Sequence, residues 1–140
     1  MNCPDSIQSN KVNIANHLKT IKEAALGPAD PRKSNEDFWI DKGQKWGITE
    51  GDARGRLCMN CEHYIETPSI QYCINTSEAK GFKTSSVPHK PPLVDIESQP
   101  VAWCSLHDIT CSPTRTCDDQ EMGGPIYDDE EYASLKNELE

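Results

Sequence analysis

Two cysteines, Cys58 and Cys61, form the one Cys-x-x-Cys pair in this sequence. This spacing places two sulfurs on one tight turn, where they can share a metal ion or an iron–sulfur cluster. A complete site needs further thiolates from elsewhere in the chain. The candidates follow downstream: Cys73, Cys104, Cys111 and Cys117. The sequence therefore predicts a thiolate-rich metal or cluster site as its chemical centre.

The redox setting of these cysteines follows from the N-terminus. Residues Met1–Ser6 contain neither the basic region nor the apolar region of a secretory signal. We therefore expect synthesis in the cytoplasm, where clustered cysteines indicate metal binding before disulfides. Cys3 is expected to be an unpaired thiol. Cys111 and Cys117 could form a disulfide that closes a small loop, or could remain buried thiols.

The spacing of the cysteines bears on which group they bind. A zinc ribbon usually has a second short-spaced pair about 15–20 residues after the first, and this sequence has none. A [4Fe–4S] cluster tolerates uneven spacing, because its irons present ligand positions at separate corners, and it gains from aromatic shielding. We therefore predict a [4Fe–4S] cluster. The alternatives are zinc, for which His63 or His107 could complete the site, and a set of disulfides or free thiols.

The segment around the cysteines resembles the high-potential iron–sulfur proteins, over roughly residues 54–106. The likeness lies in Cys58-Met-Asn-Cys61-Glu-His-Tyr64, a third cysteine at position 73, and the pair Trp103-Cys104. It implies a small loop-rich fold around one cluster. It implies the following roles: Cys58, Cys61, Cys73 and Cys104 as ligands, with Tyr64 and Trp103 as shielding. The gap from residue 73 to residue 104 is long, so Cys111 or Cys117 could take the place of Cys73.

A second resemblance concerns the role of the protein. The combination of Arg56–Tyr64 with Cys111–Asp118 is similar to small cysteine-rich proteins encoded among the structural genes of tailed phages. It favours a non-enzymatic structural subunit of a larger assembly, such as a phage virion, whose partners are other protein subunits. The alternatives are a high-potential-type electron carrier and a zinc-stabilised interaction module.

Charge, hydropathy and missing motifs argue against nucleic-acid binding, a membrane span and an enzyme. The net charge is −9, and the tail from Asp118 carries nine acidic residues against Lys136, which argues against nucleic-acid binding. No stretch approaches the roughly 18 apolar residues of a membrane span. An enzyme is not expected, since the sequence contains no HExxH motif, phosphate loop or Ser–His–Asp order. Arg115 is expected on the surface.

The elements that must position the cysteines should pack on a thin core, because only 35% of the residues are hydrophobic, and ten prolines and eight glycines indicate much loop. We expect a small, irregular, loop-rich α+β fold stapled by its cofactor, with extended arms. Helices are expected at about 11–26, capped by Ser9 or Asn10, at about 35–46, capped by Ser34, and at about 129–139. A short turn of helix should follow Thr49, and a short strand could include Leu93, Val94 and Ile96.

These elements suggest three parts. Residues 1–34 form an N-terminal helical arm and linker, although their helix could instead pack on the domain. Residues 35–117 form the cysteine-rich cluster-binding domain. Residues 118–140 form an acidic C-terminal tail with a helix, whose acidic first turn suits the positive end of the helix dipole.

Overall fold

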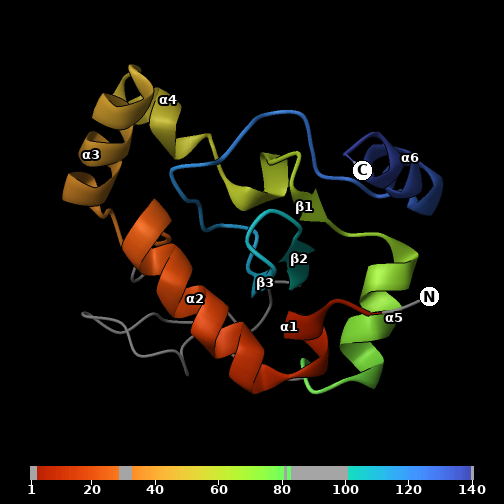
Figure 1. Ribbon diagram of the computed structural model, residues 1–140. Helices are drawn as coiled ribbons and strands as arrows, with labels where there is room; N and C mark the ends of the chain where they lie inside the picture. Colours follow the sequence, from red (N-terminus) through yellow and green to blue (C-terminus); the bar gives the residue numbers. More distant parts are fainter. Residues whose placement is uncertain (1–2, 29–32, 81, 83–100, 140) are drawn as a thin grey trace.

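The architecture comes from a computed structural model, which describes residues 3–28, 33–80, 82 and 101–139. Short helices surround a small central sheet (Figure 1). The helices are α1 (Asp5–Gln8), α2 (Asn10–Ala24), α3 (Glu36–Trp46), α4 (Glu50–Arg54), α5 (Pro68–Thr76), α6 (Asp129–Leu139) and the 3-10 helix η1 (Cys58–Asn60). The strands are β1 (Tyr64–Ile65), β2 (Ala102–Cys104) and β3 (Ile109–Cys111). The expected small α+β class is confirmed.

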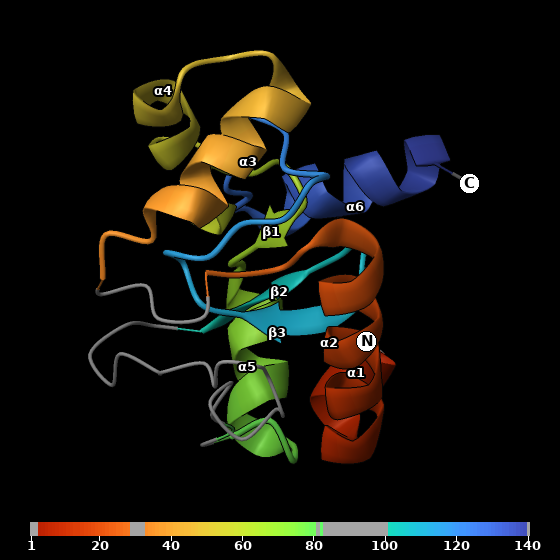
Figure 2. The same cartoon turned by 90° about the vertical axis from the view of Figure 1, so that its left-hand side faces the viewer.

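The sheet is antiparallel, with strand order β1-β2-β3. Side chains alternate between the two faces of a strand, so each strand contributes to two different cores. One core takes Tyr64 from β1 together with Ala102 from β2, while the other takes the next residue of each strand, Ile65 and Trp103. Figure 1 shows α2 and α5 on opposite sides of β2 and β3, and Figure 2 shows both helices beside these strands.

Local capping signals correctly locate the starts of two helices. The hydroxyl of Ser9 accepts a hydrogen bond from the backbone N–H of Val12, and that of Thr49 accepts one from Asp52. Such caps satisfy backbone donors that the first turn leaves unpaired. The third helix begins after Asn35 and not directly after Ser34. It ends at Trp46, where Gly47 has a φ of +69° that favours glycine.

The N-terminal helices belong to the domain core. Ile7 of α1 is fully buried against α5, and α2 packs on β3. The fully buried Asn13 side chain donates to Thr110 Oγ1 at 2.7 Å and accepts from the Thr110 backbone N–H at 3.0 Å. These contacts hold the helix on the sheet. Residues 3–28 therefore form part of the packed domain, and not an arm that extends from it.

Helix α5 was not expected, although it has a sequence signal. The Thr67 side chain accepts from the Ile70 backbone N–H, and Pro68 occupies the first turn, where proline is well tolerated. Ile70, Cys73 and Ile74 are buried at helical spacing. Three- and four-residue spacing of apolar residues behind such a cap is enough to indicate a helix. The strand expected at Leu93, Val94 and Ile96 lies outside the described residues.

The first part of the acidic tail lies against the rest of the domain. The fully buried ammonium group of Lys42 lies 2.5 Å from Asp118 Oδ1, and the backbone N–H of Ile126 donates to the Tyr64 carbonyl at 2.9 Å. Helix α6 forms as expected. In the first turn of this helix, Tyr132 packs edge-on against Trp103, with 6.2 Å between the ring centroids.

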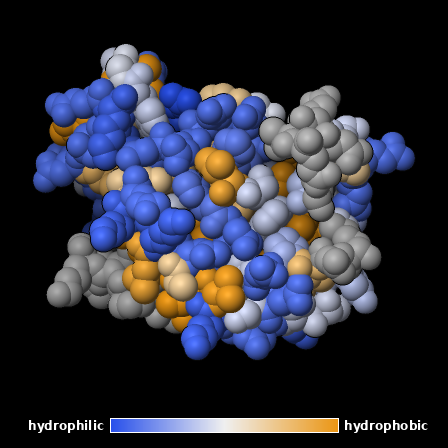
Figure 3. Space-filling view, in the orientation of Figure 1, coloured by the Kyte–Doolittle hydropathy of each residue, from blue (hydrophilic) through white to orange (hydrophobic). Residues whose placement is uncertain are grey.

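The surface is mostly polar. Figure 3 shows a largely hydrophilic face with hydrophobic side chains gathered over the region of α2, where Leu18 is 40% exposed. In the part of the chain that the structure describes, the helices are too short or too polar to cross a bilayer.

Candidate metal or cluster site

Four cysteine side chains surround one small cavity between β2, η1 and the loop that follows β3. The cavity has a volume of about 20 Å³, and its cysteines are Cys58, Cys61, Cys104 and Cys117. The fifth thiol in this region, Cys111, lies behind the cavity wall with its sulfur 3.0 Å from that of Cys58. All five are free thiols. The structure thus brings together cysteines from across sixty residues of sequence.

Backbone hydrogen bonds fix the turn that presents the first two thiols. The Cys61 N–H donates to the Cys58 carbonyl at 2.9 Å, which closes the 3-10 turn of η1. The Cys58 N–H donates to the Arg115 carbonyl at 2.7 Å, and the Met59 N–H to the Pro113 carbonyl at 3.1 Å. The Cys-x-x-Cys turn is therefore attached directly to the loop that carries Cys117.

The loop carrying Cys117 is held from its other side by the N-terminal segment. Gly27 and Thr116 exchange two backbone hydrogen bonds, of 3.0 Å and 2.8 Å. The Asp118 N–H donates to the Ala24 carbonyl at 2.7 Å. Residues on both sides of Cys117 are thereby fixed against the end of α2. The N-terminal region therefore contributes to the position of a candidate ligand, which no local sequence pattern indicated.

Cys73 does not join this group. It forms a disulfide with Cys3 and lies among the side chains of the second core, beside Ile70 and Ile74. Its position on α5 places it on the opposite side of the sheet from the cavity. Of the predicted ligands Cys58, Cys61, Cys73 and Cys104, the structure therefore brings together all but Cys73, and Cys117 lies beside the other three instead. Cys3 is not the unpaired thiol that we expected, and no bond joins Cys111 to Cys117.

The two aromatic residues proposed as shielding are separated by the sheet. Tyr64 is 2% exposed, lines the cavity, and donates its hydroxyl to the Cys111 carbonyl at 3.1 Å. Trp103 belongs to the second core, where its indole N–H donates to Asp108 Oδ1 at 2.8 Å. Adjacent residues of a strand point to opposite faces. Trp103 therefore cannot face the thiols while Cys104 does, and of these two aromatic residues Tyr64 is the one that lines the cavity.

In the metal-free protein the buried thiols favour the protonated form. Burial raises the pKa of Cys61, of Cys104 and of Cys117, the last to about 12. The hydrogen bond between Cys58 and Cys111, followed by burial, holds the pKa of Cys58 well above its usual value. A bound cation reverses this preference, because metal ligation requires the thiolate.

Backbone N–H groups already point at three of these sulfurs. The backbone amides of His63 and Glu121 lower the pKa of Cys61. The amides of His107 and Leu106 lower the pKa of Cys104, and the amide of Asp119 lowers that of Cys117. At each cysteine the opposing effect of burial is larger. Such donors stabilise negative charge on sulfur and tune bound clusters. The site is thus arranged to hold thiolates once a cation compensates for burial.

The spacing of the sulfurs bears on whether one zinc ion could bind all of them. Four thiolates on zinc, each at about 2.3 Å, lie about 3.8 Å from one another. Among the described residues, no three of these sulfurs gather within 4.8 Å of one another. One zinc ion therefore cannot bind all four thiols as they are placed. The cavity, about 20 Å³ in volume, is also too small for a four-iron cluster, so binding of either group would require the thiols to shift.

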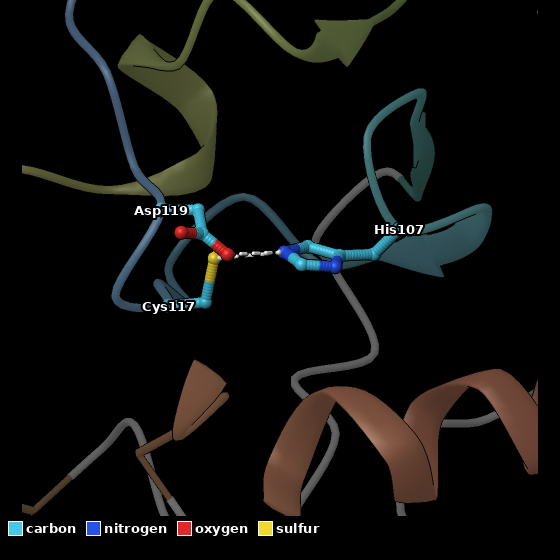
Figure 4. Close-up of side chains that lie close together, drawn as sticks. All are labelled: His107, Cys117 and Asp119. Atoms are coloured by element: carbon cyan, nitrogen blue, oxygen red, sulfur yellow. Dashed lines mark hydrogen bonds and ion pairs between the residues drawn. The ribbon is translucent and has the colours of Figure 1, made fainter. Parts of the chain in front are cut away.

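A histidine approaches the same cavity from the turn between β2 and β3. His107 Nε2 lies 3.0 Å from Asp119 Oδ2 and 3.7 Å from Cys117 Sγ (Figure 4). The base of a nucleophilic triad uses one ring nitrogen for the nucleophile and the other for the carboxylate. Here one nitrogen faces both partners. The three donors therefore converge on one point in the manner of metal ligands, and not in the manner of a catalytic triad.

Two further expectations about single residues are resolved. Arg115 is fully buried, so its expected surface position is wrong. His63 lines the same cavity as His107 but belongs to a different donor group, with its Nε2 3.9 Å from Glu62 Oε1 and a second carboxylate, from Glu121, close by. That group consists of exposed or half-buried side chains and contains no thiol.

Comparison with known proteins adds no relative. No family model, curated protein or solved structure matches this chain. The chemical interpretation of the site therefore depends on its own donors, spacing and burial.

Proposed function

We propose that this protein is a non-enzymatic structural subunit of a larger assembly, stabilised by a [4Fe–4S] cluster bound to Cys58, Cys61, Cys104 and Cys117. The observation that carries the proposal is that four thiols from three separate segments line one buried cavity. When bound, the cluster would supply iron–sulfur bonds that cross-link these segments. Free energy of metal binding becomes free energy of folding when the unfolded chain has no preformed site.

The need for such a cross-link follows from the fold. The strands of the sheet contain two or three residues each, and the loop from Ser112 to Ile126 has no regular helix or strand among the elements above. Small domains with thin cores usually depend on a staple. The chain's own contribution is to hold the thiols in place, to donate backbone N–H groups to them, and to exclude water through Tyr64.

A structural role in an assembly is supported by the surface and by the resemblance to phage structural proteins. Tyr72, Tyr127 and Met122 are 69%, 62% and 56% exposed, although each is a large hydrophobic residue. Aromatic side chains and methionine are enriched where proteins bind one another. The net charge of −9 suits basic surfaces on neighbouring subunits. The proposed partners are therefore proteins, with a virion as the proposed setting.

One observation favours a second candidate, an electron carrier. Leu106 lines the cavity and is 49% exposed, so an edge of a bound cluster would lie close to solvent. A carrier needs such an edge, whereas a purely structural cluster does not. Voltammetry on the loaded protein separates the two candidates: a reversible couple supports the carrier, and a silent response supports the structural role.

The test of the central proposal is iron, sulfide and zinc quantitation on anaerobically purified full-length protein. We expect about four irons and four sulfides per chain. Single serine substitutions at Cys58, Cys61, Cys104 and Cys117 should each remove most of the iron, whereas Cys73→Ser should retain it. Cys111→Ser serves as a matched control, because this buried thiol lies beside the cavity without lining it. Protein with neither iron nor sulfide would refute the proposal.

A further inference from the structure

A second metal site lies at the mouth of the cluster cavity. We propose that His107, Cys117 and Asp119 bind a single divalent ion of the zinc type, in competition with the cluster. The inference deepens the proposed function, since Cys117 belongs to both sites. A thiolate, an imidazole and a carboxylate are the donors that zinc uses. One ion would therefore occupy the shared cysteine when no cluster is present.

The distances between the donors fit one ion. Zinc binds nitrogen and oxygen at about 2.0–2.1 Å and sulfur at about 2.3 Å. At tetrahedral angles these bonds place the nitrogen about 3.3 Å from the oxygen and about 3.6 Å from the sulfur. The observed separations are 3.0 Å from His107 Nε2 to Asp119 Oδ2 and 3.7 Å from His107 Nε2 to Cys117 Sγ. All three donor atoms lie within 4.8 Å of one another.

The three donors differ in how far they are exposed to solvent. Cys117 is buried, whereas the side chains of His107 and Asp119 are 20% and 50% exposed. An ion can therefore enter from solvent, release the thiol proton of Cys117 to water, and keep a water molecule as its fourth ligand. Figure 4 shows the imidazole reaching the other two side chains from the opposite side, out of a different turn of the chain.

The two kinds of occupancy exclude each other because they share one thiolate. The cluster requires Cys117 together with Cys58, Cys61 and Cys104, while the single ion requires Cys117 with His107 and Asp119. Substitutions can therefore separate them. His107→Ala removes a donor from the single-ion site only, and Cys61→Ser removes a donor from the cluster site only.

The experiment uses reduced, metal-free full-length protein titrated with Zn²⁺ against a chromophoric chelator. We expect one zinc ion per chain and at least a tenfold loss of affinity in His107→Ala. His63→Ala tests the assignment to His107, because His63 also lines the cavity but belongs to a separate group of possible metal donors with Glu62 and Glu121. It should bind zinc within about twofold of the unchanged protein, and an equal loss of affinity in both histidine variants would overturn the inference. His107→Gln, which retains a polar side chain opposite Asp119, guards against misfolding and should show the same loss.

A cobalt titration identifies the donor. The sulfur-to-cobalt charge-transfer absorption should disappear in Cys117→Ser and persist in Cys61→Ser. Zinc affinity in His107→Ala and His107→Gln equal to that of the unchanged protein would overturn the inference, as would loss of the cobalt band in Cys61→Ser. Iron and sulfide loading of His107→Ala is measured separately and should be unchanged, so failure of this inference is distinguishable from failure of the proposed cluster.

Discussion

The backbone of Tyr64 in β1 pairs directly with that of Cys104 in β2. Residues that pair across an antiparallel sheet point to the same face, so the phenol ring and the thiol meet in one core. Trp103 pairs with Ile65, and these two point into the other core. The pairing therefore decides which aromatic residue protects the candidate cluster.

Tyr64 and Trp103 should consequently respond differently to substitution. Tyr64→Phe removes the hydrogen bond to the Cys111 carbonyl and should lower the free energy of unfolding by about 1 kcal/mol. Tyr64→Ala opens the cavity wall and should accelerate loss of cluster absorbance in air. Trp103→Phe should cost stability through the lost bond to Asp108 without changing that rate. Absorbance decay and urea unfolding measure the two effects, and equal decay rates in Tyr64→Ala and Trp103→Ala would contradict this assignment.

The disulfide between Cys3 and Cys73 should stabilise the fold without taking part in cofactor binding. Cys73→Ser removes a cross-link that spans 70 residues, and should lower the free energy of unfolding by about 2–4 kcal/mol. Iron content should stay at the unchanged level. Cys3→Ser should give the same loss of stability, because either substitution breaks the same bond. Iron loss on Cys73→Ser would restore the ligand set suggested by the sequence.

Gly124 should be required for the shape of the Cys-x-x-Cys turn. A Cβ atom at this position would lie 1.9 Å from the Cys61 carbonyl oxygen and 2.5 Å from its carbon, so the backbone beside a candidate ligand would have to move. Gly124→Ala should cost about 1–3 kcal/mol or more and reduce iron retention. Gly51→Ala is the control, since its nearest neighbour lies 4.0 Å away on an exposed helical turn. That change should be neutral or stabilising by about 0.5–1 kcal/mol.

The metal-free protein should lose stability in alkali. The pKa of Cys117 rises from 9.0 to about 12 in the folded state, and those of Cys58, Cys61 and Cys104 are raised as well. The folded state therefore holds thiol protons that the unfolded state releases above about pH 9. The free energy of unfolding should fall by up to about 1.4 kcal/mol per pH unit for each thiol. Urea unfolding of reduced protein between pH 8 and pH 10 measures this slope.

Two comparisons check the origin of that slope. Burial lowers the pKa of Lys42, and a lowered lysine pKa makes stability rise with pH, so this residue opposes the thiols and cannot produce the predicted fall. In cluster-loaded protein the ligand thiolates hold no protons in the folded state, so stability should instead rise with pH until the thiols of the unfolded chain ionise near pH 9. A metal-free protein whose stability stays constant from pH 8 to pH 10 would contradict the burial of the thiols.

Local sequence signals were sufficient for much of the secondary structure. The caps at Ser9 and Thr49, the glycine at position 47 and the acidic start of the last helix each act within one turn of their own position. Short-range physics therefore predicted four of the helices. Helix α5 was not predicted although Thr67 and Pro68 mark its start, because its nine residues give only about two turns over which helical spacing can be recognised.

The set of thiols that share the cavity could not be predicted in the same way. The sequence determined that Cys58 and Cys61 share one turn, because their spacing alone requires it. Only the tertiary structure placed Cys117, and not Cys73, beside Cys58 and Cys61. It also placed Cys104 and Tyr64 on one face of the sheet and brought His107 to the mouth of the cavity. These relationships depend on strand pairing and on packing between segments far apart in the chain, and no short stretch of sequence encodes such contacts by itself.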